Sequence, residues 1–178
     1  MNKSCAAALL ALIASTAAAS AAPQSFYGKT LRVNWTETRS QRDAGETAYK
    51  PVSLPFTYTV YVSSKGQLFK RTTSISASRR ATGQRDMVGM GGSGPEGAGR
   101  VSFQGNTMIT TSSHGGLGRQ IKITFDGGSS CSAQVISAKS GGGPTSVRSI
   151  ATGGMVEFES VSAGSASCSV QDGNAFAQ

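Results

Sequence analysis

The amino-acid sequence predicts an all-β fold, either a single antiparallel β-barrel with a lipocalin-like meander or a β-sandwich, with about 8–10 short strands. Several segments alternate apolar and polar residues, as a strand with one buried face does. The chain contains 23 glycines, and only 15% of its residues are charged, against a usual share of about 25%. This composition favours short strands joined by tight turns, and no segment shows a convincing helical period.

The clearest hairpin is centred on the turn Asp126-Gly127-Gly128. Apolar and polar residues alternate on both sides of this turn, and glycine suits its backbone because it adopts positive φ without a Cβ clash. We expect a three-residue loop, since a two-residue loop would place apolar residues of one strand opposite polar residues of the other. The expected pairs are Ile123 with Cys131 and Ile121 with Ala133.

The remaining strands are predicted in chain order from the same alternation. Leu31, Val33 and Trp35 form the inward face of the first strand, which carries the only tryptophan. The polar residues 38–53 are predicted to be a loop that Pro55 ends. The other expected strands are 56–62 and 67–73, which form a hairpin around Ser64-Lys65-Gly66, then 100–104, 107–112, 146–151, 155–162 and 165–170.

Residues 74–98 show neither strand nor helix periodicity and are rich in Gly, Met and Arg. A loop of this length is unusual inside a compact domain and tends to be functional or disordered. We therefore expect residues 74–98 to be a mobile loop within the single β domain, and we expect limited proteolysis to cut first after Arg79, Arg80 or Arg85.

The first residues have the pattern of a secretion signal peptide. A short positive region precedes the apolar stretch from Cys5 to Ile13, and Ala19-Ser20-Ala21 matches a cleavage site. We expect residues 1–21 to be removed, residues 22–178 to form one domain, and the protein to be exported to the periplasm or the extracellular space of a bacterium. The apolar stretch is too short for a transmembrane anchor.

Export leaves two cysteines, Cys131 and Cys168. An oxidising compartment makes a disulfide the default state of such a pair. Both cysteines share a strand face with small apolar neighbours, so we predict a bond between Cys131 and Cys168.

Three pieces of the chain resemble a recurring set of small exported bacterial β-proteins of unknown function. They are Tyr61 to Phe69, Ile121 to Asp126 with Ser130-Cys131-Ser132-Ala133, and Ser167 to Asn174. The resemblance implies a β fold and export, and it implies no activity.

Catalytic chemistry has few candidate residues. His114 is the only histidine, it lies in a Ser-Ser-His-Gly-Gly segment, and no serine lies in a Gly-x-Ser-x-Gly elbow. We expect a non-catalytic protein that needs no cofactor.

One alternative is a copper carrier. Met87 and Met90 supply the soft thioether ligands that Cu(I) prefers, and His114 or Met108 could complete the set. The competing interpretation is a loop that happens to carry two methionines.

Charge suggests a second function. Residues 27–100 hold twelve Lys or Arg against five Asp or Glu, whereas the later residues balance. The hypothesis is that Arg79, Arg80 and Arg85 bind anionic cell-envelope components. Export argues against nucleic acid as the partner. A small apolar ligand inside a barrel lined by Trp35 is the remaining alternative.

Overall fold

A computed structural model describes residues 21–76, 82–90, 100–139, 145–149 and 151–176; the side chains of residues 84–90 and 114 are not described. The described part is all-β, with ten strands and one short 3-10 helix. The helix is η1 (Gln24–Phe26). The strands are β1 (Lys29–Asp43), β2 (Lys50–Val62), β3 (Gln67–Ile75), β4 (Thr82–Met90), β5 (Arg100–Gln104), β6 (Thr107–His114), β7 (Leu117–Phe125), β8 (Cys131–Lys139), β9 (Thr145–Arg148) and β10 (Met155–Asp172).

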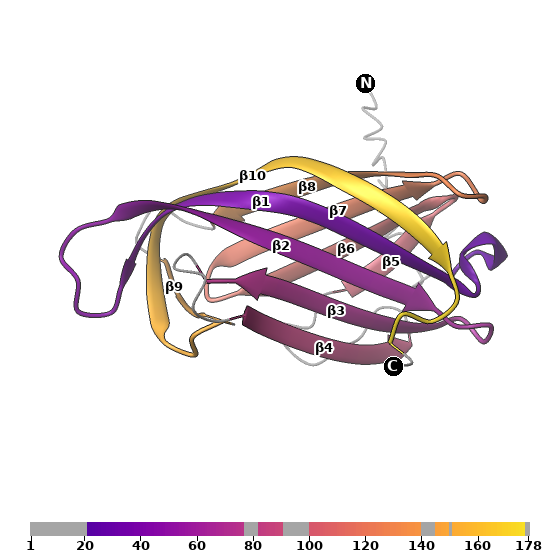
Figure 1. The fold of residues 1–178 in the computed structure, drawn as a ribbon, viewed down its shortest axis with the longest axis horizontal. Helices are drawn as coiled ribbons and strands as arrows, with labels where there is room; N and C mark the ends of the chain where they lie inside the picture. Colours follow the sequence, from indigo (N-terminus) through magenta and orange to yellow (C-terminus); the bar gives the residue numbers. More distant parts are fainter. Residues whose placement is uncertain (1–20, 77–81, 91–99, 140–144, 150, 177–178) are drawn as a thin grey trace, which may run out of the picture.

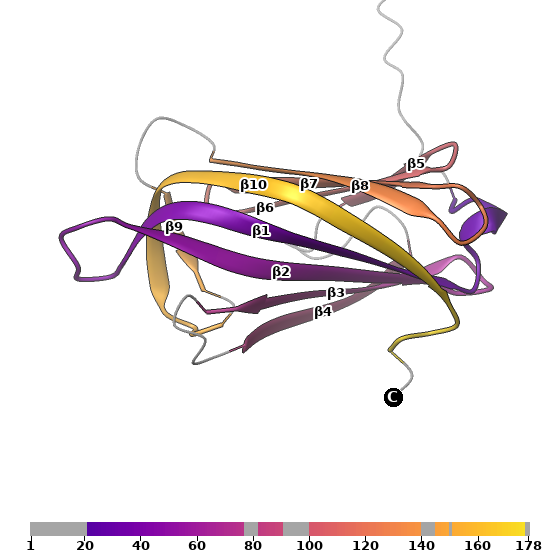
Figure 2. The same cartoon turned by 45° about the horizontal axis from the view of Figure 1, so that its top comes forward.

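The strands form two antiparallel sheets that face each other (Figure 1). The six-stranded sheet has the order β4-β3-β2-β1-β10-β9, and the four-stranded sheet has the order β5-β6-β7-β8. Figure 2 shows that the larger sheet curls as a half-barrel around one side of the smaller sheet. The predicted all-β fold and its meander connectivity are confirmed, because β1 to β4 and β5 to β8 each pair in chain order.

The first two strands are longer than the sequence suggested. The loop predicted for residues 38–53 is wrong, because β1 continues to Asp43 and β2 begins at Lys50. Pro55 does not end a loop but pairs with Thr36 inside β2. Proline is tolerated there because the pairing of β2 with β3 begins only at Phe56, so this part of β2 is a sheet edge.

The segment 74–98 contains a strand. β4 pairs with β3 over nine residues, from Gln67 opposite Met90 to Ile75 opposite Thr82. The expectation of an uninterrupted loop over residues 74–98 is therefore wrong. Ladder hydrogen bonds join backbone groups, so a strand at a sheet edge does not need an alternating side-chain pattern. Residues 77–81 and 91–99 lie outside the described residues, so the expected mobility and proteolysis stay predictions.

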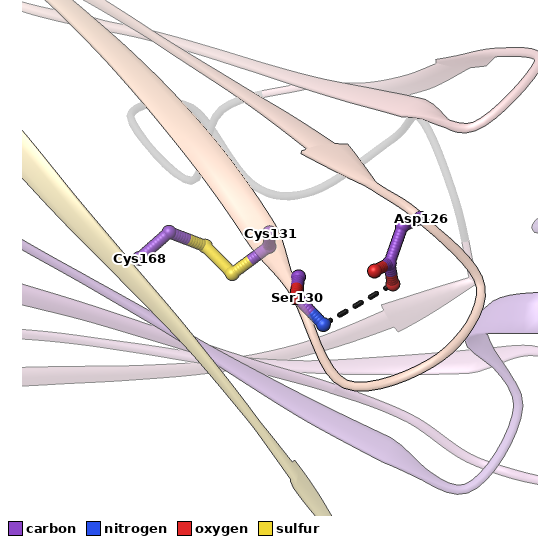
Figure 3. The surroundings of a disulfide bond; sticks show 4 residues. All are labelled: Asp126, Ser130, Cys131 and Cys168. Carbon is purple, nitrogen blue, oxygen red and sulfur yellow. Dashed lines mark hydrogen bonds between the residues drawn. A yellow bond between two sulfur atoms is a disulfide. The ribbon is translucent and has the colours of Figure 1, made fainter.

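The β7–β8 hairpin has the predicted faces but a different register. Ile123 pairs with Ala133 rather than Cys131, and Ile121 pairs with Val135 rather than Ala133. The loop therefore has five residues instead of three. The Asp126 carboxylate stabilises this longer loop by accepting hydrogen bonds from the backbone N–H groups of Gly128 (2.8 Å) and Ser130 (3.1 Å). Figure 3 shows the second of these bonds.

The disulfide between Cys131 and Cys168 is present and joins the two sheets (Figure 3). It connects the start of β8 to β10, with the two Cα atoms 5.5 Å apart. The predicted strands 155–162 and 165–170 are one continuous strand, β10, whose pairing with β1 is interrupted by register shifts near Trp35 and Ser40. At Cys168, β10 pairs only with β1, so the disulfide fastens the four-stranded sheet to an edge of the larger sheet.

The predicted signal peptide falls almost wholly on residues 1–20, which lie outside the described residues. In the part of the chain that the structure describes, no helix is long and apolar enough to cross a membrane.

Candidate functional site

The inward faces of several strands change from apolar to polar at the same level of the molecule. On β1, Leu31, Val33 and Trp35 are buried, and the next buried residue on that face is Glu37. The same change occurs on neighbouring strands of the other sheet. It runs from Ile121 to Arg119 on β7, from Val135 to Ser137 on β8, and from Met108 to Thr110 on β6. On these four strands, the inward residues are therefore apolar toward one end of the molecule and polar toward the other.

Glu37 is the centre of the polar half, and its side chain is fully buried. Its Oε2 atom accepts hydrogen bonds from Nη2 of Arg119 (2.6 Å) and from Oγ of Ser137 (2.7 Å). Its Oε1 atom accepts a hydrogen bond from Nε of Arg39 (2.6 Å), and Nη2 of Arg39 forms an ion pair with the same oxygen. One carboxylate from β1 thus holds two guanidinium groups, one from each sheet.

The same two guanidinium groups also stack on aromatic rings. The Cζ atom of Arg119 lies 4.5 Å from the ring centroid of Phe56 and 5.3 Å from that of Trp35. The Cζ atom of Arg39 lies 4.8 Å from the centroid of Phe158 and 5.3 Å from that of Phe56. Arginine stacks well on aromatic faces, so both groups are held in position without a ligand.

The charges of this cluster are mutually dependent. Burial acts to raise the pKa of Glu37, but Arg119 and Arg39, with the hydrogen bonds from Arg119 and Ser137, outweigh it and hold that pKa below its usual range. Burial lowers the pKa of Arg39, although Glu37 opposes the change. All three groups are charged at neutral pH, so the cluster carries one net positive charge.

A cavity of ≈ 270 Å³ opens beside the cluster. It lies between the ends of β1, β3, β6 and β9 and the starts of β2, β7 and β10, at the end of the molecule where Figure 1 shows β9 and the β1–β2 connection. Arg39, Arg119 and Gln41 line it together with apolar side chains and several hydroxyl groups. The apolar lining residues are Leu54, Phe56, Ile75, Leu117, Val147, Ala151 and Val156. The cavity therefore combines cationic groups with apolar walls.

Some polar side-chain atoms at the cavity make no hydrogen bond within the described part of the chain. The Nη1 atoms of Arg39 and Arg119 have no hydrogen-bond partner among the described residues, and these side chains remain 10% and 13% exposed. The Oε1 atom of Gln41 is buried and likewise lacks a partner in the described part of the chain. An unpaired buried polar atom such as this oxygen is costly, so it is often explained by a ligand, an ion or a water molecule.

The residues singled out from the sequence lie elsewhere or are not described. Arg79 and Arg80 lie outside the described residues. The backbones of Arg85, Met87 and Met90 belong to β4, opposite Thr72, Lys70 and Gln67, but their side chains are not described.

The two residues proposed as a third copper ligand, His114 and Met108, both lie on β6. His114 ends β6 opposite Leu117, and its side chain is not described. Met108 is fully buried in the apolar core. Among the described residues, no group of three or more His, Cys, Asp or Glu side chains is arranged to hold a metal ion. The copper hypothesis therefore receives no support from Met108, while Met87, Met90 and His114 remain untested.

The expectation of a loop over residues 38–53 excluded the cavity residues Arg39 and Gln41 of β1 from the predicted interior. The signal was nevertheless present, since the inward sequence positions after Trp35 continue as Glu37, Arg39 and Gln41. A strict period of two, followed beyond the apolar residues, would have placed these polar side chains inside.

Comparison of the chain with protein-family models, with curated proteins and with solved structures finds no match.

Proposed function

We propose that this protein is an exported, non-catalytic binding domain that holds a small amphipathic anion in the cavity beside Glu37. The observation that carries the proposal is that two stacked guanidinium groups, Arg39 and Arg119, share a single buried carboxylate at the wall of an apolar cavity. Binding sites for small molecules typically combine apolar walls with a few fixed polar groups. An anion would complete the charge balance, and an apolar body would fill the space.

Binding is favoured over catalysis by the state of Glu37. A general base works best when its pKa lies near the working pH. The pKa of Glu37 is lowered, and both carboxylate oxygens already accept hydrogen bonds from Arg39, Arg119 and Ser137. Glu37 therefore suits the role of a fixed counter-ion that orients the arginines.

Export is part of the proposal. It rests on the signal pattern of residues 1–21 and on the disulfide between Cys131 and Cys168, which is typical of oxidising compartments. Detection of the mature chain in the periplasm or medium, beginning at Ala22, is the expected result. A cytoplasmic protein that still begins with Met1 would contradict it.

The test uses the fluorescence of Trp35, the only tryptophan in the chain, because the Arg119 guanidinium lies over its ring. The exported protein is titrated with octanoate, octyl sulfate and octyl phosphate, with octanol as the uncharged control. We expect saturable 1:1 binding of at least one anion and much weaker binding of octanol. Absence of saturable binding by all three anions would overturn the proposal.

Two variants locate the binding. Arg119→Gln should weaken the binding of the anion at least tenfold, because one positive charge and its donors leave the cavity. Arg32→Gln removes the same charge from an exposed position on the outer face of β1 and should leave affinity unchanged. Equal losses in both variants would mean that long-range attraction, rather than the cavity, causes binding. Circular dichroism of each variant verifies the fold.

The envelope-binding hypothesis for Arg79, Arg80 and Arg85 remains a separate prediction. Its test is co-sedimentation with anionic lipid vesicles at low and high salt, because attraction between exposed charges is screened within about 8 Å at physiological ionic strength. Replacement of all three arginines by serine should abolish that binding while cavity binding persists. Sedimentation unchanged by salt and by the triple substitution would exclude this surface.

A further inference from the structure

We infer that the cavity selects a singly charged organic acid, such as a monocarboxylate, with a compact apolar tail. The inference rests on the proposed function and names the class of its ligand. It depends on three features of the described residues: the charge balance of the cavity, the geometry of its donors and the nature of its walls.

The charge balance favours a ligand with a single negative charge. Among the described side chains, the charged groups that line or adjoin the cavity are the guanidinium groups of Arg39, Arg119 and Arg148 and the carboxylates of Glu37 and Asp43. Three positive charges against two negative charges leave one in excess. A dianion such as a phosphate monoester would therefore bring one uncompensated charge into a partly enclosed, low-dielectric space, which is costly.

The donor geometry suits an oxyanion such as a carboxylate. Guanidinium groups are planar forks that match two oxygens of a carboxylate or of a phosphate, so the choice between these two head groups depends on charge. Arg39 and Arg119 already bind one carboxylate, that of Glu37, through their Nε and Nη2 edges. Their Nη1 groups have no partner among the described residues, so a second carboxylate on this side would receive donors from both arginines.

The walls require an apolar tail of limited size. Leu54, Phe56, Val147 and Val156 are buried and border the cavity. Burial of apolar area contributes roughly 25 cal/mol per Å², so a carboxylate without a tail would lose most of the favourable free energy. A cavity of ≈ 270 Å³ also limits the length of the tail that can be enclosed.

The first experiment compares head groups at a constant tail. At neutral pH, octanoate carries one negative charge, whereas octyl phosphate carries about 1.5 to 2. Calorimetric titration should give affinities for octanoate and for octyl sulfate, which also carries a single charge, at least tenfold higher than for octyl phosphate, and butyrate should bind more weakly than octanoate. Equal or tighter binding of the phosphate would overturn this inference and leave the proposed function standing, whereas no binding of any anion would overturn both.

The second experiment changes the charge of the cavity. Glu37→Gln raises the excess from one positive charge to two at nearly constant volume. The ratio of octanoate affinity to octyl phosphate affinity should then fall at least tenfold. An unchanged ratio in a folded variant would contradict the charge argument.

A third variant keeps the test decisive if Glu37→Gln does not fold. Ala151 lines the cavity from the β9–β10 turn and is only half-buried. Ala151→Phe should fill the space without altering any charge and should weaken octanoate binding at least tenfold. Octanoate affinity equal to that of the wild-type protein would place the acid outside the cavity.

Discussion

The two ends of this β structure are built from the same strands but differ in what their interiors contain. At one end, the short helix η1 inserts Phe26 between the sheets, and its ring centroid lies 5.3 Å from that of Phe103 and 5.2 Å from that of Phe125. These three side chains are buried, and no charged side chain is found among the buried residues of this aromatic cluster. In Figures 1 and 2 this closed end is marked by the indigo helix and the β7–β8 turn.

The opposite end contains a buried ion cluster and a cavity instead of an aromatic cluster. Here β1 contributes Glu37 and Arg39, and β7 contributes Arg119. A buried ion cluster is weak evidence for stability, because the desolvation of charges offsets much of their attraction. We infer from this comparison that the aromatic end and the disulfide supply most of the stability. The cavity end can therefore tolerate a buried ion cluster that contributes little to stability.

Removal of the Phe26 ring should have the largest effect on stability. Phe26→Ala deletes a fully buried ring, and such changes cost about 3–5 kcal/mol because they leave a cavity. Chemical denaturation should show this decrease in the free energy of unfolding. Ile136→Ala is the matched control, since Ile136 is 46% exposed and should change stability by less than about 0.5 kcal/mol. A loss below about 1 kcal/mol for Phe26→Ala would remove the distinction between the ends.

Loss of the disulfide should be nearly as severe. The bond joins residues 37 positions apart, and the chain-entropy model gives about 4 kcal/mol for a loop of this length. The double variant Cys131→Ser, Cys168→Ser should unfold at a correspondingly lower denaturant concentration. Two free thiols per mature wild-type chain, measured with a thiol reagent under denaturing, non-reducing conditions, would contradict the bond itself.

Acid should weaken the cavity end through Glu37. Its pKa is lower in the folded protein than the ordinary value of 4.5, so between these two values the unfolded chain binds more protons. The contribution of Glu37 to stability is therefore present above about pH 4.5 and is lost as the pH falls through the folded pKa. The free energy of unfolding of the wild-type protein, minus that of Glu37→Gln, should decrease over this window. A constant difference from pH 7 to pH 3 would show that Glu37 is not held as an ionised counter-ion.

The smallest effect should have the opposite sign. Gln41 presents a buried oxygen without a partner in the described part of the chain, and replacement by Leu removes that penalty. We expect Gln41→Leu to leave stability unchanged or raise it by about 1 kcal/mol. Thermal unfolding followed by circular dichroism measures the change. A destabilisation of several kcal/mol would mean that Gln41 supports the fold rather than a ligand.

The sequence predicted the fold well where apolar residues alternate. Leu31, Val33 and Trp35 are buried as expected, and so are Ile121 and Ile123. The faces of the β7–β8 hairpin were predicted correctly although its register was not, because a change of two residues preserves the side-chain period. The longer loop depends on hydrogen bonds of Asp126, which a hydrophobic pattern does not report.

The cavity was missed for a different reason. Polar residues after an apolar strand have the composition of a loop, so the loop expected over residues 38–53 hid the inward positions of Arg39 and Gln41. Glu37 is buried because Arg119 and Ser137, far away in sequence, supply its counter-charge and hydrogen bonds. Strand β4 was also missed, because its residues do not alternate in polarity and its pairing with β3 depends on backbone hydrogen bonds.

The central claim is that Arg39 and Arg119, at the cavity end, contact the ligand directly. Nitrogen–proton correlation spectra of the arginine Nε–H groups test it, because Arg39 and Arg119 donate through Nε to Glu37 and lie in a protected environment. On titration with octanoate, we predict saturable shifts of the Arg39 and Arg119 resonances at a common affinity, with the exposed Arg32 unaffected. Saturable binding that leaves both resonances unmoved, or moves Arg32 equally, would contradict the account.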